Sequence, residues 1–303
     1  MIIRSAAGTV LWCVITAASA AGFTFAALGD APYFEGEEPT FIAMLAGLNR
    51  EPLAFAVHVG DFKNGHSDCS DALYLQRKQW FELSHHPFIF VPGDNEWTDC
   101  WRRFAGGYDP QERLNRLRQI FFADAASLGQ RRLALTLQSE TDQRYRYPEH
   151  ARWVHEGVLF ITLNVPGGDN NFARNRAEFR ERDAAVREWI SQSFRFARAQ
   201  QLGGVILMMQ ANPWAAVGAR RHGFTPLFET ITTETIDFSG EVVLIHGDTH
   251  RFRVDRPLPH PDMRRPLPNF TRIEVFGSPS VNWVRVRVEN VGGRLKFVVT
   301  PGS

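Results

Sequence analysis

Four aspartates each follow a glycine at the end of a short apolar run: Asp30, Asp61, Asp94 and Asp248. A single Gly-Asp pair is more often a simple turn, because both residues favour turn conformations. Four such pairs at strand ends would gather four carboxylates in one place, and carboxylates at short range repel one another unless protons or cations neutralise them. The pattern therefore predicts a metal cluster, with Gln210 ending a fifth run and His250 nearby.

The apolar runs that carry these aspartates have the length and composition of buried strands. They cover residues 23–28, 53–59, 87–91 and 241–246. Helical apolar spacing fills residues 37–50 and 70–86, between the first three runs. This β-α-β-α-β order favours a layered sheet with helices outside it, and ligands of such sheets collect beyond the carboxyl ends of the strands.

The rest of the chain continues the alternation of strands and helices. We expect a strand over 158–165, a long amphipathic helix over 176–200 and a strand over 203–210. After residue 251, four segments alternate in polarity and predict antiparallel strands. Residues 102–146 are helical but less regular and are interpreted as an insertion or cap, and residues 256–269 form a proline-rich surface loop. Because no repeat or linker interrupts the pattern, we predict one domain over residues 21–303.

The first twenty residues have the pattern of a secretory signal peptide. Arg4 supplies positive charge, an apolar run follows, and Ala18-Ser19-Ala20 forms a small-residue cleavage pattern. The run is too short for a membrane span, so we expect no stable membrane anchor. An N-terminal core helix, which would leave a cytosolic protein, is the alternative. We predict that the mature protein is secreted or periplasmic.

Charge and cysteine usage narrow the functional classes further. The formal net charge of the 303 residues is only +1, which argues against nucleic-acid binding driven by electrostatics. Cys13 would leave with the signal peptide, so Cys69 and Cys100 remain. An even count in an oxidising compartment predicts a Cys69–Cys100 disulfide that joins the loops after Asp61 and Asp94. Two free buried thiols are the alternative.

The order of the motifs resembles that of the calcineurin-like metallophosphoesterases. Five segments carry the resemblance, over roughly residues 23–255: "GDAPY", "VGDFKNG", "GDNE", "MMQANPW" and "HGDTH". The resemblance implies an α/β fold in four layers, an αββα sandwich of two mixed sheets flanked by helices. It also implies two metal ions bridged by one aspartate.

Carried over residue by residue, the resemblance also implies a ligand set. Asp30 and His250 fall on ligands of the first metal, and Asp61 falls on the bridging carboxylate. Asp94 stands where the family has an asparagine ligand of the second metal, and Gln210 and Asp248 stand where it has histidines. Pro32 replaces the remaining first-metal histidine and cannot coordinate through its side chain, although Tyr33 beside it could take that place.

The motifs that surround these ligands imply further roles. Asn95 stands where the family has its catalytic histidine, and it cannot deliver a proton at neutral pH. Glu96 matches the acidic residue that closes that motif. Lys63 and Asn64 follow Asp61 and could contact a phosphate oxygen of the substrate, with solvated loop residues as the alternative.

The changes from the family pattern replace nitrogen ligands with oxygen ligands, which suit hard cations. We therefore expect two divalent ions, with Mn²⁺ or Mg²⁺ ahead of iron, Ca²⁺ or Zn²⁺. The leading hypothesis is a phosphoesterase-like hydrolase of small-molecule phosphomonoesters or phosphodiesters, in which a metal-bridged water attacks phosphorus. The alternative is a non-catalytic secreted protein of the same fold that binds a metal and a phosphorylated or glycan ligand. The oligomeric state is open.

Overall fold

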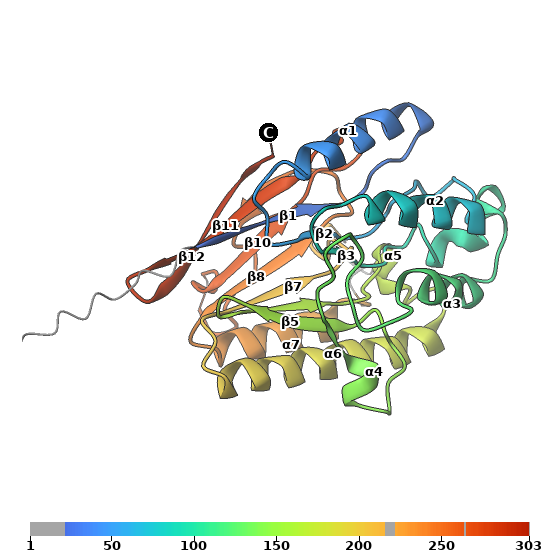
Figure 1. Ribbon diagram of the computed structural model, residues 1–303. Coiled ribbons are helices and arrows are strands. Elements are labelled where there is room, and N and C mark those ends of the chain that lie inside the picture. Colours follow the sequence, from blue (N-terminus) through green and yellow to red (C-terminus); the bar gives the residue numbers. More distant parts are fainter. Residues whose placement is uncertain (1–21, 216–221, 264, 303) are drawn as a thin grey trace, which may run out of the picture.

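Two mixed β-sheets form the centre of the molecule in a computed structural model that describes residues 22–215, 222–263 and 265–302 (Figure 1). The first sheet has the strand order β12-β11-β1-β2-β3, and the second has the order β4-β5-β6-β7-β8-β10-β9. The predicted signal peptide lies outside the described residues.

The first sheet contains β1 (Phe23–Leu28), β2 (Ala56–His58), β3 (Phe88–Phe90), β11 (Val284–Val291) and β12 (Arg294–Pro301). The second contains β4 (Thr136–Leu137), β5 (Ala151–His155), β6 (Val158–Thr162), β7 (Gly204–Met208), β8 (Glu241–His246), β9 (Arg253–Asp255) and β10 (Phe270–Glu274). All the predicted strands are present. The sequence interpretation did not anticipate β4 or β5.

Parallel pairing brings the Gly-Asp motifs to one end of the sandwich. In the first sheet β1, β2 and β3 run parallel, and in the second β6, β7, β8 and β10 do. The prediction of antiparallel strands after residue 251 is correct for β9, β11 and β12 but wrong for one pairing of β10. This strand inserts between β8 and β9, parallel to the former and antiparallel to the latter. Alternating polarity identifies a strand but not its direction, so the sequence could not decide this.

Five helices cover the outer faces of the two sheets (Figure 1). They are α1 (Glu38–Leu48), α2 (Asp71–Glu82), α3 (Pro110–Phe121), α6 (Arg176–Ala199) and α7 (Thr225–Ile236). Local sequence sets several of their starts. Ser70 caps α2 by accepting from the amide of Leu73, and Asp109 caps α3 directly before a proline at the first helical position. Among the described residues, no helix is long and apolar enough to cross a membrane.

Shorter elements complete the chain. These are the short helices α4 (Gln138–Thr141) and α5 (Gly167–Asn170) and the 3₁₀ turns η1 (Glu35–Glu37), η2 (Thr98–Trp101) and η3 (Arg103–Ala105). The region 102–146, which the sequence marked as an insertion or cap, contains α3 and packs Leu114 and Leu117 into the core of the first sheet.

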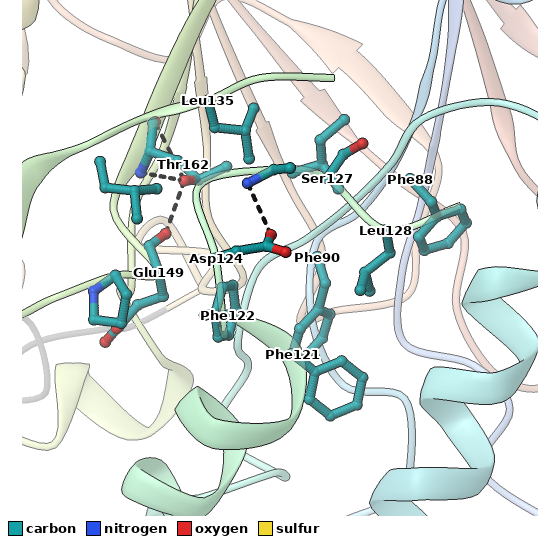
Figure 2. Close-up of a pocket in the computed structure, with 15 residues that line it drawn as sticks. Phe88, Phe90, Phe121, Phe122, Asp124, Ser127, Leu128, Leu135, Glu149 and Thr162 are labelled. Atoms are coloured by element: carbon teal, nitrogen blue, oxygen red, sulfur yellow. Dashed lines mark hydrogen bonds between the residues drawn. The ribbon is translucent and has the colours of Figure 1, made fainter. Parts of the chain in front are cut away.

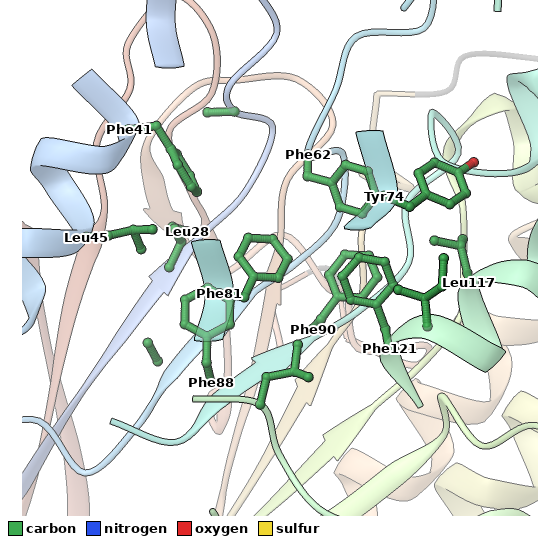
Figure 3. Close-up of a cluster of buried hydrophobic side chains, with 14 of the residues drawn as sticks. Leu28, Phe41, Leu45, Phe62, Tyr74, Phe81, Phe88, Phe90, Leu117 and Phe121 are labelled. Atoms are coloured by element: carbon green, nitrogen blue, oxygen red, sulfur yellow. The ribbon is translucent and has the colours of Figure 1, made fainter. Parts of the chain in front are cut away.

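Three buried layers confirm the four-layer αββα sandwich. On β1, Leu28 faces α1 and α2 together with the cluster around Phe41 and Phe81, which Figure 3 shows. Phe25, on the opposite face of the same strand, packs between the sheets against Phe160. The third layer holds the second sheet against α6 and α7. Because successive strand residues point to opposite faces, strands buried on both sides must be apolar throughout, and this explains the continuous apolar runs.

The predicted Cys69–Cys100 disulfide is present. The two cysteines are fully buried, and their Cα atoms are 5.8 Å apart. Cys69 precedes α2 and Cys100 lies in η2, so the bond joins the loop after β2 to the loop after β3. These are two of the loops that carry Gly-Asp motifs.

Candidate functional site

Four candidate ligands sit directly after strand ends in a backbone conformation that is rare for residues with side chains. Their φ angles are +51° for Asp30, +60° for Asp61, +78° for Asp248 and +60° for His250. Residues other than glycine seldom adopt this left-handed region, and such strain concentrates at functional sites. The loops therefore make sharp turns that place these side chains, rather than merely reversing the chain.

The glycines of the motifs make room for carboxylates from other strands. A Cβ on Gly93 would lie 2.0 Å from Oδ1 of Asp61, and a Cβ on Gly247 would lie 1.9 Å from Oδ2 of Asp30. Both distances are far inside van der Waals contact. Two of the four Gly-Asp pairs thus contribute a carboxylate and also leave space for the carboxylate of another pair, so a turn alone does not explain the motif.

Asp61 is the centre of a hydrogen-bond network. Its Oδ1 accepts from the amide of Asn95 at 3.1 Å. Its Oδ2 accepts from Asn95 Nδ2 and Gln210 Nε2, both at 3.0 Å, and lies 3.2 Å from the Tyr33 hydroxyl. Gln210 Oε1 accepts from the amide of Gly167 at 2.6 Å, which fixes the orientation of the side-chain amide. The predicted bridging carboxylate therefore does contact residues from several strand-end loops.

His250 and Asp30 form a second part of the site. The amide of Asp248 donates to both carboxylate oxygens of Asp30, at 3.0 and 3.1 Å. Nδ1 of His250 lies 2.8 Å from the carbonyl oxygen of Ser278, which can only accept. Nδ1 therefore donates to this carbonyl, and Nε2 faces Tyr33 Oη at 3.1 Å and Asp30 at 3.5 Å. Metal-binding histidines are commonly oriented by such a bond to a carbonyl.

Asp94 and Asp248 approach each other beside Gly167. A Cβ on Gly167 would lie 2.7 Å from Asp94 Oδ2 and 3.2 Å from Asp248 Oδ1. Asp248 Oδ2 accepts from the amide of Asn212 at 2.8 Å. All six predicted ligands thus lie at one end of the sandwich, linked through shared contacts.

Burial and mutual repulsion raise the pKa values of the carboxyls in this cluster. Burial, followed by the charge of Asp248, raises the pKa of Asp94 to about 7, and burial raises the pKa of Asp248 to about 6. The pKa values of Asp30 and Asp61 are raised well above their usual range, again first by burial. The pKa of the buried Glu96 is raised for the same reason.

One buried cation faces these carboxyls. Lys63 is fully buried, and burial lowers the pKa of its ammonium to about 8 although Glu96 and Asp61 act in the opposite direction. Five carboxylates and one ammonium, when all are ionised, leave four uncompensated negative charges. That is the charge of two divalent cations.

The predicted substrate contacts Lys63 and Asn64 make hydrogen bonds within the chain. Lys63 Nζ donates to the backbone carbonyl of Asn64 at 3.0 Å and is shielded from solvent. Asn64 Nδ2 donates to the carbonyl of Tyr33, and its Oδ1 accepts from the amides of His66 and Ser67. Both side chains hold the loop after β2 in shape, and a contact with substrate stays a prediction.

Tyr33 and Glu96 make more contacts in the site than their sequence context indicated. The Tyr33 hydroxyl lies within 3.4 Å of Asp30, Asp61, Asn95 and His250. Glu96 accepts from the amides of Gly93 and Phe62, and so ties the loop after β3 to the loop after β2. The position of Tyr33, three residues after Asp30 and beside Pro32, was the only signal of its role.

Within the described residues, no group of three or more His, Cys, Asp or Glu side chains is arranged to hold a metal ion. The side chains hydrogen-bond to one another through Tyr33, Asn95 and Gln210 instead. By charge and chemistry, however, the residues fit hard divalent cations, because the donors are mostly carboxylate oxygens and carry uncompensated negative charge.

A second, small cavity lies away from the carboxylates and is too small to be a substrate site. It lies between β3 and residues 121–137 and has a volume of about 20 Å³, room for one water-sized molecule (Figure 2). Its polar groups are paired within the chain: Thr162 Oγ1 donates to the carbonyl of Glu149, and Asp124 accepts from the amide of Ala126.

We compared this structure, with its two mixed sheets and flanking helices, with solved structures. The structure of PhoD aligns with 94% of this chain and 69% of its own, at 11% sequence identity and a TM-score of 0.53. Haemophilus influenzae NAD nucleotidase (NadN) aligns with 93% of this chain and 55% of its own, at 12% identity and a TM-score of 0.45. No protein-family profile matches the sequence, and neither does any curated protein. The likeness to PhoD shows that this chain shares the fold of that protein, with two mixed sheets at its centre, and this is the fold that the motif resemblance implied.

Proposed function

We propose that this protein is a metal-dependent hydrolase of small phosphoesters. The observation that carries the proposal is the excess of negative charge at the carboxyl ends of both sheets, where the buried Asp30 and Asp61 and the half-buried Asp94 and Asp248 face one another. A buried cluster of this kind is costly unless cations neutralise it. The cluster also lies where open sheets collect their ligands.

The residues that would hold two divalent ions are Asp30, Asp61, Asp94, Gln210, Asp248 and His250. Bound there, the ions would lower the pKa of a water molecule and neutralise phosphoryl oxygens. The chain itself orients the donors. Asn95 and Gln210 fix the carboxylate of Asp61, and the carbonyl of Ser278 fixes the tautomer of His250.

Asn95 has two functions in this proposal. Its backbone amide and its side chain both donate to Asp61, so it positions the carboxylate. Its second Nδ2 proton is directed at Tyr33 Oη at 3.2 Å and would reach a substrate oxygen only by leaving that partner, and an amide has no proton to give to a leaving group. Esters whose alcohols leave without protonation are therefore the expected substrates.

The mature protein in this proposal acts outside the cytoplasm. The Cys69–Cys100 disulfide supports this placement, because disulfides persist in oxidising compartments. Sequencing the N-terminus of the protein purified from its native host tests it, and a mature chain that still begins at Met1 would contradict it.

The decisive experiment combines metal content with turnover. Purified protein is stripped with EDTA and reconstituted with Mn²⁺, Mg²⁺ or Zn²⁺, and hydrolysis of nitrophenyl phosphomonoesters and phosphodiesters is then measured. We expect about two bound ions per chain and activity with Mn²⁺ or Mg²⁺ that Asp61→Asn abolishes. Ions that bind without turnover of any ester would refute the hydrolase proposal.

One observation favours a second candidate, a non-catalytic binding protein of the same fold. The Tyr33 hydroxyl already lies between Asp30, Asp61 and His250, within hydrogen-bonding distance of Asp61 and His250. Replacing Tyr33 with phenylalanine separates the two candidates. A hydrolase that holds two ions through the six ligands should still bind two ions after the substitution, whereas a protein in which the phenol stands in place of the first ion should bind one ion before the substitution and gain room for a second after it.

A further inference from the structure

An arginine-lined pocket lies next to the carboxylate cluster. Its volume is about 440 Å³, and its walls are formed by Asn212, Trp214, Ala215, Thr249, Arg251, Arg253 and Arg272. Three guanidinium groups line it and no carboxylate does. The pocket of similar volume beside α3, at about 430 Å³, also contains arginines, but Glu178 and Glu181 line it as well. The arginine-lined pocket thus has an excess of positive charge in its walls.

Cross-strand pairing accounts for only two of the three arginines. Arg272 on β10 lies opposite Asp255 on β9 and pairs with it, and Arg253 lies opposite Glu274, with its Nε 3.4 Å from a carboxylate oxygen. Such pairs stabilise an edge of a sheet. Arg251 follows His250 and forms no ion pair with any residue in the described ranges. Its charge is therefore not explained by sheet stability.

Arg272 is the most buried of the three arginines. Its side chain is 3% exposed, and its guanidinium lies 4.9 Å from the ring of Trp214. Its Nη1 has no hydrogen-bond partner among the described residues. A buried donor without an acceptor is costly. An acceptor in the pocket would lower that cost if Trp214 shifted to admit it.

The pocket and the carboxylate cluster share a wall. The amide of Asn212 donates to Asp248, and Asn212 Nδ2 donates to the hydroxyl of Thr249 at 2.8 Å. Both Asn212 and Thr249 line the pocket, and Asp248 precedes Thr249 in the chain. A ligand that spans this wall would have one end at the carboxylate cluster and the other among the arginines.

We propose that this pocket binds a second anionic group, a phosphate or a carboxylate, of the molecule on which the site acts. Guanidinium groups bind such planar or tetrahedral anions through paired charge-assisted hydrogen bonds. The inference rests on the proposed function for the identity of the ligand. It deepens that function by assigning the substrate class: phosphoesters that carry a separate negative charge.

Anion binding can be tested without the metal. In EDTA, the carboxylate cluster repels anions, so binding of pyrophosphate measured by calorimetry reports the arginine pocket. Arg251→Gln removes one charge-assisted contact and is expected to weaken binding about 10- to 100-fold, and Arg251→Lys should recover part of the loss. Arg287→Gln is the matched control, because Arg287 is an exposed arginine on β11 of the other sheet. If the parent and Arg251→Gln bound pyrophosphate with equal affinity, or if the parent did not bind it, the proposal that the pocket binds an anion would be refuted.

Catalytic preference then decides whether the anion belongs to the substrate. With Mn²⁺ bound, two aryl phosphates are compared, one of which carries a flexible chain that ends in a carboxylate. The parent should prefer the carboxylate ester by about 10-fold or more in kcat/KM, and Arg251→Gln should lose that preference while Arg287→Gln keeps it. Absence of the preference in the parent would overturn the substrate assignment. If neither ester turns over but pyrophosphate still binds in EDTA, the proposed hydrolase function is refuted, whereas anion binding by the pocket is supported.

Discussion

Replacing Gly93 with alanine tests whether the glycines of the Gly-Asp motifs make room for carboxylates. The new Cβ would lie 2.0 Å from Asp61 Oδ1 and 2.7 Å from the Asp61 amide nitrogen. The backbone of Gly93 does not have a positive φ angle, so alanine brings no conformational strain of its own. Any effect therefore comes from the contact with Asp61.

The expected cost follows from what Asp61 must give up. Overpacking of a tight site costs about 1–3 kcal/mol. A displaced Asp61 also loses at least one of its hydrogen bonds from Asn95 and Gln210, and each such bond to a charged group contributes about 1.5–3 kcal/mol. We therefore expect Gly93→Ala to lower the free energy of unfolding by about 2.5–6 kcal/mol, and to weaken Mn²⁺ binding at least about 10-fold because the bridging carboxylate moves.

Gly36→Ala is the matched control. Gly36 lies in η1, and a Cβ added there would have no atom within 4 Å. Its substitution should change the free energy of unfolding by no more than about 1 kcal/mol. Urea unfolding followed by circular dichroism, with calorimetric Mn²⁺ titration, measures both effects. If Gly93→Ala matched Gly36→Ala within about 1 kcal/mol and kept its Mn²⁺ affinity, the steric reasoning would be refuted.

Three other predictions concern the disulfide, pH and the leaving group. Removing both cysteines as Cys69→Ala/Cys100→Ala frees a loop closed over a sequence separation of 31 and should cost about 4 kcal/mol in urea unfolding; a loss below about 1 kcal/mol would contradict this. The raised carboxyl pKa values predict that, in EDTA, stability falls as pH rises from about 6.5 to 7.5. The folded state there must give up protons that the unfolded state has already lost, and Mn²⁺ should restore the stability. A flat thermal-unfolding profile between those pH values would show that the cluster is neutralised within the chain. Asn95 cannot act as a general acid, so nitrophenyl esters should turn over much faster than alkyl phosphates. Asn95→His should raise the rate for alkyl phosphates more than the rate for nitrophenyl esters, by up to about 10²-fold. A rate that does not depend on the pKa of the leaving group would contradict this prediction.

The pH window is chosen so that buried histidines do not contribute. Burial lowers the pKa of His58 to about 4 and the pKa values of His246 and His150 to about 3. A histidine with a lowered pKa destabilises the folded state as pH falls below about 6.5, because only the unfolded chain then takes up the proton. Above about pH 6.5 these histidines are neutral in both states. Lys63, whose pKa is lowered to about 8, loses its proton in the folded state above about pH 7.5 and acts in the opposite direction, so the slope of the carboxyl cluster is measured between about pH 6.5 and 7.5.

Local sequence determined the elements and the location of the site. Residues 242–245, for example, are apolar at every position, and strands buried on both faces require this. The helix of residues 176–199 follows from its amphipathic spacing. The repeated Gly-Asp pairs identified the carboxylates that meet at the strand ends, because parallel strands bring their carboxyl ends to one edge.

Only the tertiary structure decided how those residues contact one another. The sequence could not show that β10 runs parallel to β8, because direction depends on which neighbour a strand meets. It could not place the Tyr33 hydroxyl among four site residues, or show that Lys63 is buried. The arginine pocket is likewise invisible in the sequence, since Trp214 and Arg272 are 58 positions apart. Residue types and short-range spacing fix which groups can act, but contacts between distant segments depend on packing, and packing is a property of the whole fold.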